Sequence, residues 1–293
     1  MSSFDQLRDL CFTNRFDWKF SRPEIFLKNF AQKAEPADDV YVMMLERCAA
    51  EGPRRSMAIG NDGFYEIAQD DFCIIEIKIA RGIEVRLDHR TVGNGCGGFF
   101  FLVAEEGSSV VYNHNVSNEI GPVGFESISF LAEAGSRIDL NQKVATGSDF
   151  RSEISFFLTG EGSKIDGKIF HIGEASFFDC RTLQYHLGRN TISNLVAKFA
   201  LKENANSSFC GKIIATETAI DSEARQLNKN IILSDSARTT SVPSMDIRNP
   251  GIKCYHGATV SEINSEQLFY LRSRGIDLQT AEQMIVDGFL EFY

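Results

Sequence analysis

An apolar run followed by a Gly-Ser pair recurs at nearly constant spacing through the middle of the chain. The pattern occupies residues 101–108, 130–136 and 157–163. Its Gly-Ser pairs begin at residues 107, 135 and 162, so the steps are 28 and 27 residues. A unit repeated at such a period is typical of a solenoid, in which each coil buries its apolar face by stacking on its neighbours.

Residues from about 72 to 255 also alternate between apolar and polar types. Ile75, Ile77 and Ile79, for example, flank Glu76 and Lys78. This alternation gives a strand one apolar face and one solvated face. We therefore expect a mainly β fold with a β-helix core of about two half-coils per period. A β-sandwich or jelly roll, which also has short strands at regular spacing, is the alternative.

The N-terminal part of the chain has a different pattern, which indicates helices. Ser21, Pro23 and Glu24 precede apolar positions in the order typical of a helix start. A second helix is plausible over residues 38–45. We expect an N-terminal helical region over residues 1–70.

Two helices are expected at the other end of the chain. Ser265 is the expected cap of the first, Gly275 closes it, and Asp277 caps the second. The apolar residues of the last helix form one stripe. This stripe either packs on the β core, which is the favoured interpretation, or stays exposed for a partner. The expected boundaries are a β-helix core over 71–255 and a C-terminal helical segment over 256–293.

Composition and charge exclude several classes of protein. The seven cysteines are scattered and include no C-x-x-C pair, which is typical of reduced thiols and not of a disulfide framework. The net charge of -10 argues against broad nucleic-acid binding. We see no apolar run that spans a bilayer and no secretory leader at the first residues. A cytoplasmic protein without membrane or nucleic-acid partners is expected.

Cys254 and His256 are the strongest candidates for a chemical role. Residues two apart in a strand point to the same face, and a thiolate and an imidazole there can share iron or zinc. Two ligands do not complete a metal site, so the others must come from elsewhere in the fold, from a second chain or from sulfide. From the spacing alone, a buried thiol beside a hydrogen-bonded histidine is the favoured interpretation.

Other motifs argue against a conventional enzyme. Residues 162–168 fit the phosphate-loop pattern G-x-x-x-x-G-K, but Ile169 follows where a Ser or Thr is needed, and we expect a β-turn. We find no nucleophile elbow and no H-E-x-x-H motif. The remaining histidines are isolated in sequence and are expected at the surface or as hydrogen-bonded core residues: His89, His114, His171 and His186.

The sequence K-C-Y-H-G-A-T at residues 253–259 resembles the signature of the SufB/SufD family of iron–sulfur cluster assembly proteins. Segments 209–214, 228–235 and 268–275 carry the same resemblance, which covers roughly residues 140–293. It implies a right-handed β-helix core with a helical C-terminal domain, in agreement with the repeat.

The resemblance implies a cytosolic complex with a SufB-like subunit and a SufC-like ABC-type ATPase, with a homodimer as a further option. It implies that His256 and Cys254 hold a nascent iron–sulfur cluster or iron, transiently, at the interface between subunits. A flavin in the complex is compatible with it. The ATPase is expected to grip the C-terminal helices at Leu268, Phe269, Tyr270, Leu271, Arg272 and Arg274.

Two departures indicate the subunit type. Asn228 stands where SufB carries an essential cysteine, and Gly257 stands where SufB has Glu. The expectation is therefore a SufD-like, non-catalytic scaffold subunit. A β-helix or jelly-roll enzyme acting on carbohydrate or a small molecule is the competing class, and it predicts a carboxylate or histidine cluster on one sheet face. In a third hypothesis, a purely structural partner, Cys254 and His256 bind nothing.

Overall fold

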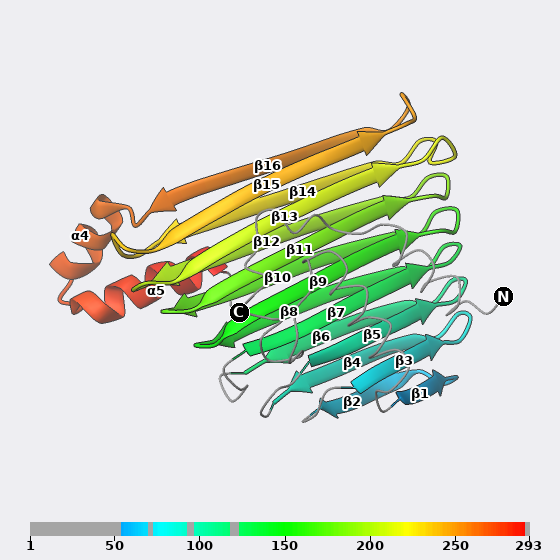
Figure 1. The fold of residues 1–293 in the computed structure, drawn as a ribbon, viewed down its shortest axis with the longest axis horizontal. Helices are drawn as coiled ribbons and strands as arrows, with labels where there is room; N and C mark the ends of the chain where they lie inside the picture. The colour runs from blue at the N-terminus through cyan, green and yellow to red at the C-terminus, as the bar shows by residue number, and fades with distance from the viewer. Residues whose placement is uncertain (1–53, 70–72, 93–96, 118–122, 291–293) are drawn as a thin grey trace, which may run out of the picture.

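The computed structural model describes residues 54–69, 73–92, 97–117 and 123–290. In this part of the chain, strands β1 to β16 precede helices α4 and α5. The strands stack in two layers, from β1 and β2 at one end to β15 and β16 at the other, and the helices lie beside the β16 end (Figure 1). The helices expected up to about residue 50 lie outside the described residues.

Odd-numbered strands form one eight-stranded sheet, sheet A, and even-numbered strands form the other, sheet B. Sheet A contains β1 (Arg54–Ile59), β3 (Cys73–Ile79), β5 (Gly97–Ala104), β7 (Val123–Ala132), β9 (Asp149–Leu158), β11 (Phe177–His186), β13 (Asn206–Ala215) and β15 (Arg238–Ile247). Sheet B contains β2 (Gly63–Gln69), β4 (Glu84–Thr91), β6 (Ser109–Val116), β8 (Arg137–Thr146), β10 (Lys164–Glu174), β12 (Ile192–Lys202), β14 (Glu223–Ile232) and β16 (Lys253–Glu262).

All neighbouring strands within each sheet pair in parallel. Val110 pairs with Ile138, and Ile138 pairs with Ile165, so register partners repeat the 28- and 27-residue steps of the sequence. Parallel pairing of every second strand confirms the β-helix and excludes the sandwich, whose strands run antiparallel.

The Gly-Ser pairs form the turns between coils, as expected. Gly107, Gly135 and Gly162 have φ of 68°, 62° and 71°, a region that glycine adopts without steric cost. The following serine locks the turn, since Ser108 Oγ donates to Glu105 O at 2.6 Å. Residues 162–168 are therefore a turn and the start of a strand, not a phosphate loop.

The outward faces of the two sheets differ in how far their side chains are buried. In β4, outward Glu84 and Arg86 are exposed, as alternation predicts. In β3, however, outward Glu76 is only 5% exposed, so the expected solvated face is wrong there. Arg151 and Asp179, outward on β9 and β11, are fully buried and form an ion pair at 3.2 Å. Parallel sheets are commonly buried on both faces, which removes the alternating burial pattern.

The strands extend beyond the expected range of 71–255 at both ends. β1 and β2 lie within the expected N-terminal helical region of 1–70, and β16 continues to Glu262. Pairing of β1 with β3 and of β2 with β4 decides the structure of residues 54–69. The hydrogen bonds of β1 and β2 to the neighbouring strands outweigh the weak local conformational preference of residues 54–69.

The two C-terminal helices are α4 (Ser265–Ser273) and α5 (Leu278–Leu290). Asn264, one residue before the expected Ser265, caps α4 by accepting from the backbone N–H groups of residues 266 and 267. Gly275 follows α4 with φ of 86°, and Asp277 caps α5 by accepting from Thr280 N at 3.0 Å. Both of these features were expected.

The helices differ in how they contact the β-helix. In α5, Val286 and Leu290 are buried against Ala200 of β12 and Ile231 of β14, which confirms the packing interpretation for the last helix. In α4, by contrast, no residue is buried. Among the residues that the structure describes, no helix is long and apolar enough to cross a bilayer.

Candidate functional site

Cys254 and His256 lie on β16, the last strand of sheet B, which pairs with β14 alone among the described strands. Cys254 is in register with Ala224, and His256 is in register with Gln226. Both β14 residues are buried inside the β-helix. Side chains in register share a face, so Cys254 and His256 point toward the interior at the open end of the stack. The expectation that they share one face of a strand is confirmed.

Both side chains are half-buried and have unused coordinating capacity. Cys254 is a free thiol, and burial raises its pKa above the ordinary 9.0. The thiol is therefore protonated at neutral pH unless a metal or cation displaces the proton. His256 Nδ1 is buried and has no hydrogen-bond partner. A buried nitrogen of this kind costs free energy until a ligand or donor occupies it.

The pair forms only part of a metal site. Within the described ranges, no group of three His, Cys, Asp or Glu residues is placed to hold a metal ion. A thiolate and an imidazole supply two of the three or four protein ligands that such sites usually have. The arrangement is therefore a half-site at the end of the solenoid.

Residues on the other face of β16 do not join this pair. Tyr255 is 56% exposed and stacks near Arg225, whose guanidinium carbon lies 5.7 Å from the ring centroid. Gly257 is in register with Leu227, and a Cβ on Gly257 would meet Leu227 Cδ2 at 3.1 Å. A glutamate at position 257 would point away from the interior, so it would act on a different surface from His256.

A network of polar side chains lies behind His256, inside the stack. Gln226 Nε2 donates to Gln184 Oε1 at 3.0 Å, and Gln184 Nε2 donates to Ser193 Oγ at 2.7 Å. The same Ser193 Oγ lies 2.7 Å from His186 Nε2. The interior of the last coils therefore includes a hydrogen-bonded polar network.

Asn228 also faces this interior, two residues along β14 from Gln226. It is 1% exposed, its Nδ2 donates to Ala197 O at 3.4 Å, and its Oδ1 accepts from Asn230 Nδ2 at 2.7 Å. An amide held in this way has no nucleophilic sulfur. A cysteine at position 228 would face the interior, but in this chain Asn228 occupies the position and forms hydrogen bonds there.

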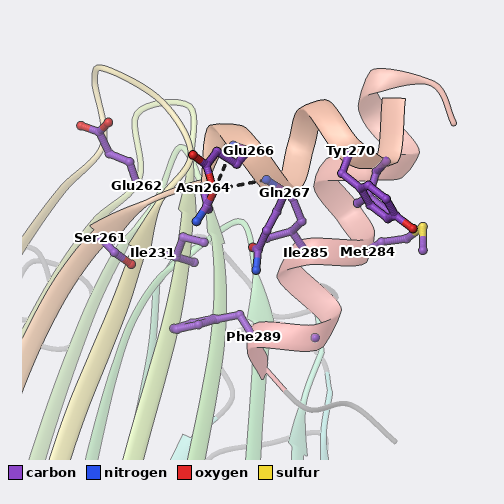
Figure 2. A pocket seen from close by; sticks show the side chains of 12 residues that line it. Ile231, Ser261, Glu262, Asn264, Glu266, Gln267, Tyr270, Met284, Ile285 and Phe289 are labelled. Carbon is purple, nitrogen blue, oxygen red and sulfur yellow. Dashed lines mark hydrogen bonds between the residues drawn. The ribbon is translucent and has the colours of Figure 1, made fainter. Parts of the chain in front are cut away.

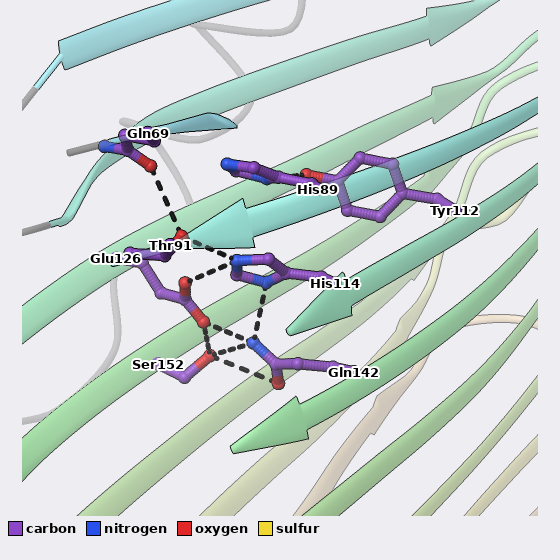
Figure 3. A network of polar contacts seen from close by, with 8 residues as sticks. All are labelled: Gln69, His89, Thr91, Tyr112, His114, Glu126, Gln142 and Ser152. Atoms are coloured by element: carbon purple, nitrogen blue, oxygen red, sulfur yellow. Dashed lines mark hydrogen bonds and ion pairs between the residues drawn. The ribbon is translucent and has the colours of Figure 1, made fainter. Parts of the chain in front are cut away.

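A second buried polar network lies nearer the other end of the stack (Figure 3). Glu126 accepts a hydrogen bond from Ser152 Oγ at 2.8 Å and contacts Gln142 Nε2. Its other oxygen lies 3.5 Å from His114 Nε2, and the His114 ring stacks on His89 at 4.5 Å between centroids. All five side chains are buried.

Burial decides the charge states in this second network. It raises the pKa of Glu126 to about 8, and it lowers the pKa of His89 to about 3. Burial, with a smaller contribution from His89, also holds the pKa of His114 well below its ordinary 6.5. Near neutral pH these groups are uncharged, so the contact of Glu126 with His114 is not an ion pair.

The sequence did not predict either buried polar network, the one around Gln226 or the one around Glu126. The four histidines were expected at the surface or as hydrogen-bonded core residues, and the core alternative is confirmed, since all four are buried and hydrogen-bonded: His89, His114, His171 and His186. The available signal was their place at inward positions of an alternating pattern. Only the register shows which inward polar residues meet.

The expected partner surface lies on α4, beside a hollow of about 910 Å³ between the helices and the strands β14 and β16 (Figure 2). Tyr270, Leu271, Met284 and Phe289 contribute to its lining. Six residues were expected to contact a partner, and their exposure varies: Phe269 is 76% and Tyr270 56% exposed, Arg272 and Arg274 are exposed, and Leu268 and Leu271 are half-buried. The helix thus presents an exposed aromatic surface, in which Arg274 lies over the Tyr270 ring with its guanidinium carbon 5.2 Å from the ring centroid.

Comparison with known proteins agrees with this geometry. The family model "SUF system FeS cluster assembly, SufBD core domain" matches residues 74–289, well over half of the chain. These residues include the strands from β4 to β16, helix α4, and helix α5 up to Phe289. The chain therefore belongs to the SufBD family of iron–sulfur cluster assembly proteins.

Named relatives cover only parts of the chain and of themselves. Iron-sulfur cluster assembly protein SufD of Escherichia coli (strain K12) is 33% identical over 145 residues, which are 49% of this chain and 34% of that protein. Family member slr0076 of Synechocystis is 37% identical over 97 residues, 33% of this chain and 21% of the relative. Family member ycf24 of Galdieria sulphuraria is 29% identical over 191 residues, 62% of this chain and 84% of the relative.

Proposed function

We propose that this chain is a SufD-like scaffold subunit, which pairs with a SufB-like subunit and a SufC-like ATPase to build and transfer iron–sulfur clusters. The observation that carries the proposal is the half-site of Cys254 and His256 on an edge strand. Its two ligands face an open end of the β-helix, where a second subunit supplies the others. The cluster is the cargo of this complex, and the scaffold itself catalyses no reaction.

The open end of the stack supports pairing with another β-helix. Met245, Ile247 and Val260 occupy inward register positions of β15 and β16, yet they are 43%, 38% and 57% exposed. Unpaired strand edges and exposed core positions favour association with a further layer of strands. A second copy of this chain is the alternative partner at this end.

Asn228 and Gly257 support the SufD-like assignment. Asn228 fills its interior position with a hydrogen-bonded amide, so a persulfide-accepting cysteine must come from the partner. The exposed Phe269 and Tyr270 of α4 support docking of the ATPase at the C-terminal helices. Flavin participation stays a prediction of the family resemblance.

The competing enzyme hypothesis expects a carboxylate or histidine cluster on one sheet face. On the outer face of sheet B, Asp139 and Asp166 are instead bound by Arg137, at 2.9 and 3.3 Å. The histidines other than His256 lie in the interior of the stack. These placements favour the scaffold.

Anaerobic cluster reconstitution tests the proposal on the chain alone and on its mixture with a SufB-like protein. We expect the mixture to hold a cluster and the chain alone to lose it on desalting, because the chain supplies two ligands. The double variant Cys254→Ser/His256→Ala should lower cluster retention in the mixture. A stable cluster on the chain alone, or unchanged retention in the variant mixture, would contradict the half-site.

A further inference from the structure

The last coil carries a third group that can bind a soft metal ion, the thioether of Met245 on β15. Met245 is in register, through β13, with Gln184 of β11. Cys254 on β16 is in register, through β14, with Ser193 of β12. Gln184 and Ser193 therefore hold, two coils earlier, the inward positions that Met245 and Cys254 hold at the open end.

The side chains at these two positions meet across the interior of the earlier coil. Gln184 Nε2 donates to Ser193 Oγ at 2.7 Å. Methionine has the unbranched length of glutamine, and cysteine has the length of serine. Because the coils repeat the same backbone path, the Met245 and Cys254 sulfur atoms are placed to approach each other at the open end.

His256 belongs to the same cluster. Its register partner Gln226 donates Nε2 to Gln184 Oε1 at 3.0 Å, so the position of His256 also adjoins the position that Met245 continues. Met245 is 43% exposed although it lies at an inward position, and His256 Nδ1 is buried without a partner. The register therefore brings a thiol, a thioether and an imidazole together at the open end of the stack.

This ligand set fits a soft monovalent cation. Thiolate and thioether sulfur favour Cu⁺, whereas zinc sites use thiolate, imidazole and carboxylate groups. One thiolate neutralises a monovalent ion, and a divalent ion would leave a net positive charge in a half-buried site, which costs free energy. Binding displaces the thiol proton of Cys254 to solvent.

We propose that Met245, Cys254 and His256 bind one Cu⁺ ion within a single chain. The site shares two residues with the half-site for the cluster, but it does not depend on the scaffold function. Met245 separates the two roles, because protein-bound iron–sulfur clusters are held by thiolate and imidazole ligands. Met245→Leu should therefore weaken Cu⁺ binding and leave cluster retention with a SufB-like protein unchanged.

Anaerobic titration of the full-length chain with Cu⁺ against a colorimetric Cu⁺ chelator tests the proposal. X-ray absorption at the copper edge identifies the ligands, and we expect two sulfurs and one nitrogen at the tightest site. Met245→Leu should weaken this site by at least about tenfold, because even loss of a group that only supports a metal ligand costs about 10–100-fold in affinity. Leucine conserves the volume and the apolar character, so the variant should keep its thermal stability.

Met57→Leu is the matched control. Met57 holds an inward position on β1, at the opposite end of the stack, and is 40% exposed. We expect this variant to bind Cu⁺ as the parent does. The chain has seven cysteines, so the variants are compared at the tightest site. A tightest site that Met245→Leu does not weaken, a copper spectrum with one sulfur ligand, or equal weakening by both methionine variants would overturn the proposal.

Discussion

His256 and Gln226 occupy register-paired, inward-facing positions on β16 and β14, and Gln226 donates its side-chain amide onward to Gln184 at 3.0 Å. The imidazole at the open end of the stack therefore adjoins a hydrogen-bonded interior. Its own Nδ1 is buried without a partner. His89 Nε2 and His171 Nε2 in the core also lack partners, so the half-buried position of His256 beside Cys254 at the open end is what favours a role in binding.

Removal of this imidazole should affect cluster assembly and leave the fold intact. We expect His256→Ala to lower the iron and sulfide content of the anaerobically isolated complex by about tenfold or more. The free energy of unfolding should change by less than about 0.5 kcal/mol, because His256 lies half-buried on an edge strand. Thermal unfolding measures this change. Tyr255→Ala, on the outward face of the same strand, is the control and should keep full cluster content. Unchanged content in His256→Ala would remove the ligand role.

The exposed aromatic residues of α4 should be required for ATPase docking. Phe269→Ser with Tyr270→Ser should abolish co-purification of the SufC-like protein, because large aromatic side chains commonly dominate the binding energy of an interface. Both side chains are mostly exposed, so stability should be preserved. Phe64→Ser removes a 54% exposed aromatic residue at the other end of the stack and should leave the ATPase bound. Retention of the ATPase by the α4 variant would place its dock elsewhere.

Glu126 should make the protein less stable in mild alkali. Its pKa is raised by burial to about 8 from its ordinary 4.5, so the folded state binds a proton that the unfolded chain releases within this window. The free energy of unfolding therefore falls as pH rises, by about 2 kcal/mol between pH 6.5 and pH 8. Denaturant unfolding across this range measures the slope. Glu126→Gln keeps the acceptor oxygen and should flatten it, and an unchanged slope would contradict the assignment.

The buried histidines should produce the opposite dependence in acid. Burial lowers the pKa of His89 and His171 to about 3 and of His186 to about 4, from the ordinary 6.5. Below pH 6.5 the unfolded chain binds these protons more readily, so stability is lost as pH falls toward the folded values. Together with Glu126, this places the expected stability maximum near pH 7. Chemical unfolding at pH 5 and pH 6.5 tests it, and greater stability at pH 5 would be inconsistent.

One turn glycine should tolerate no side chain. A Cβ on Gly160 would lie 1.9 Å from the backbone N of Ala134 in the adjacent coil. We expect Gly160→Ala to destabilise the protein by about 1–3 kcal/mol, because the stacked turns must separate. Gly60→Ala, which has open space around its Cβ, is the control and should change stability little. Thermal unfolding measures the stability of both variants. Equal stability of Gly160→Ala and Gly60→Ala would refute the account.

The architecture was predictable because its signal is periodic. Gly107, Gly135 and Gly162 repeat at the coil length, and the turns require glycine at these points. The end of α4 at Gly275 was also predictable, because the signal for it is a single glycine next to the helix. The strands β1 and β2 were not predicted, since their residues are mostly exposed and their structure depends on pairing with later strands.

The candidate site was predictable only in part. The spacing of two residues placed Cys254 and His256 on one face of a strand. Gln226 and Gln184 lie far from them along the chain, so the sequence does not show the polar interior that these glutamines form. Burial of outward Glu76 on sheet A was likewise hidden, because a residue's own strand does not show what covers it. These features arise from register and packing between coils, which one sequence does not display.

The central claim is that this chain is one scaffold subunit of a larger assembly. Anaerobic co-expression with the SufB-like and SufC-like proteins of the same organism, followed by native mass spectrometry, tests it most directly. The account predicts a single species that contains all three proteins. A chain that remains alone in the presence of both would contradict it.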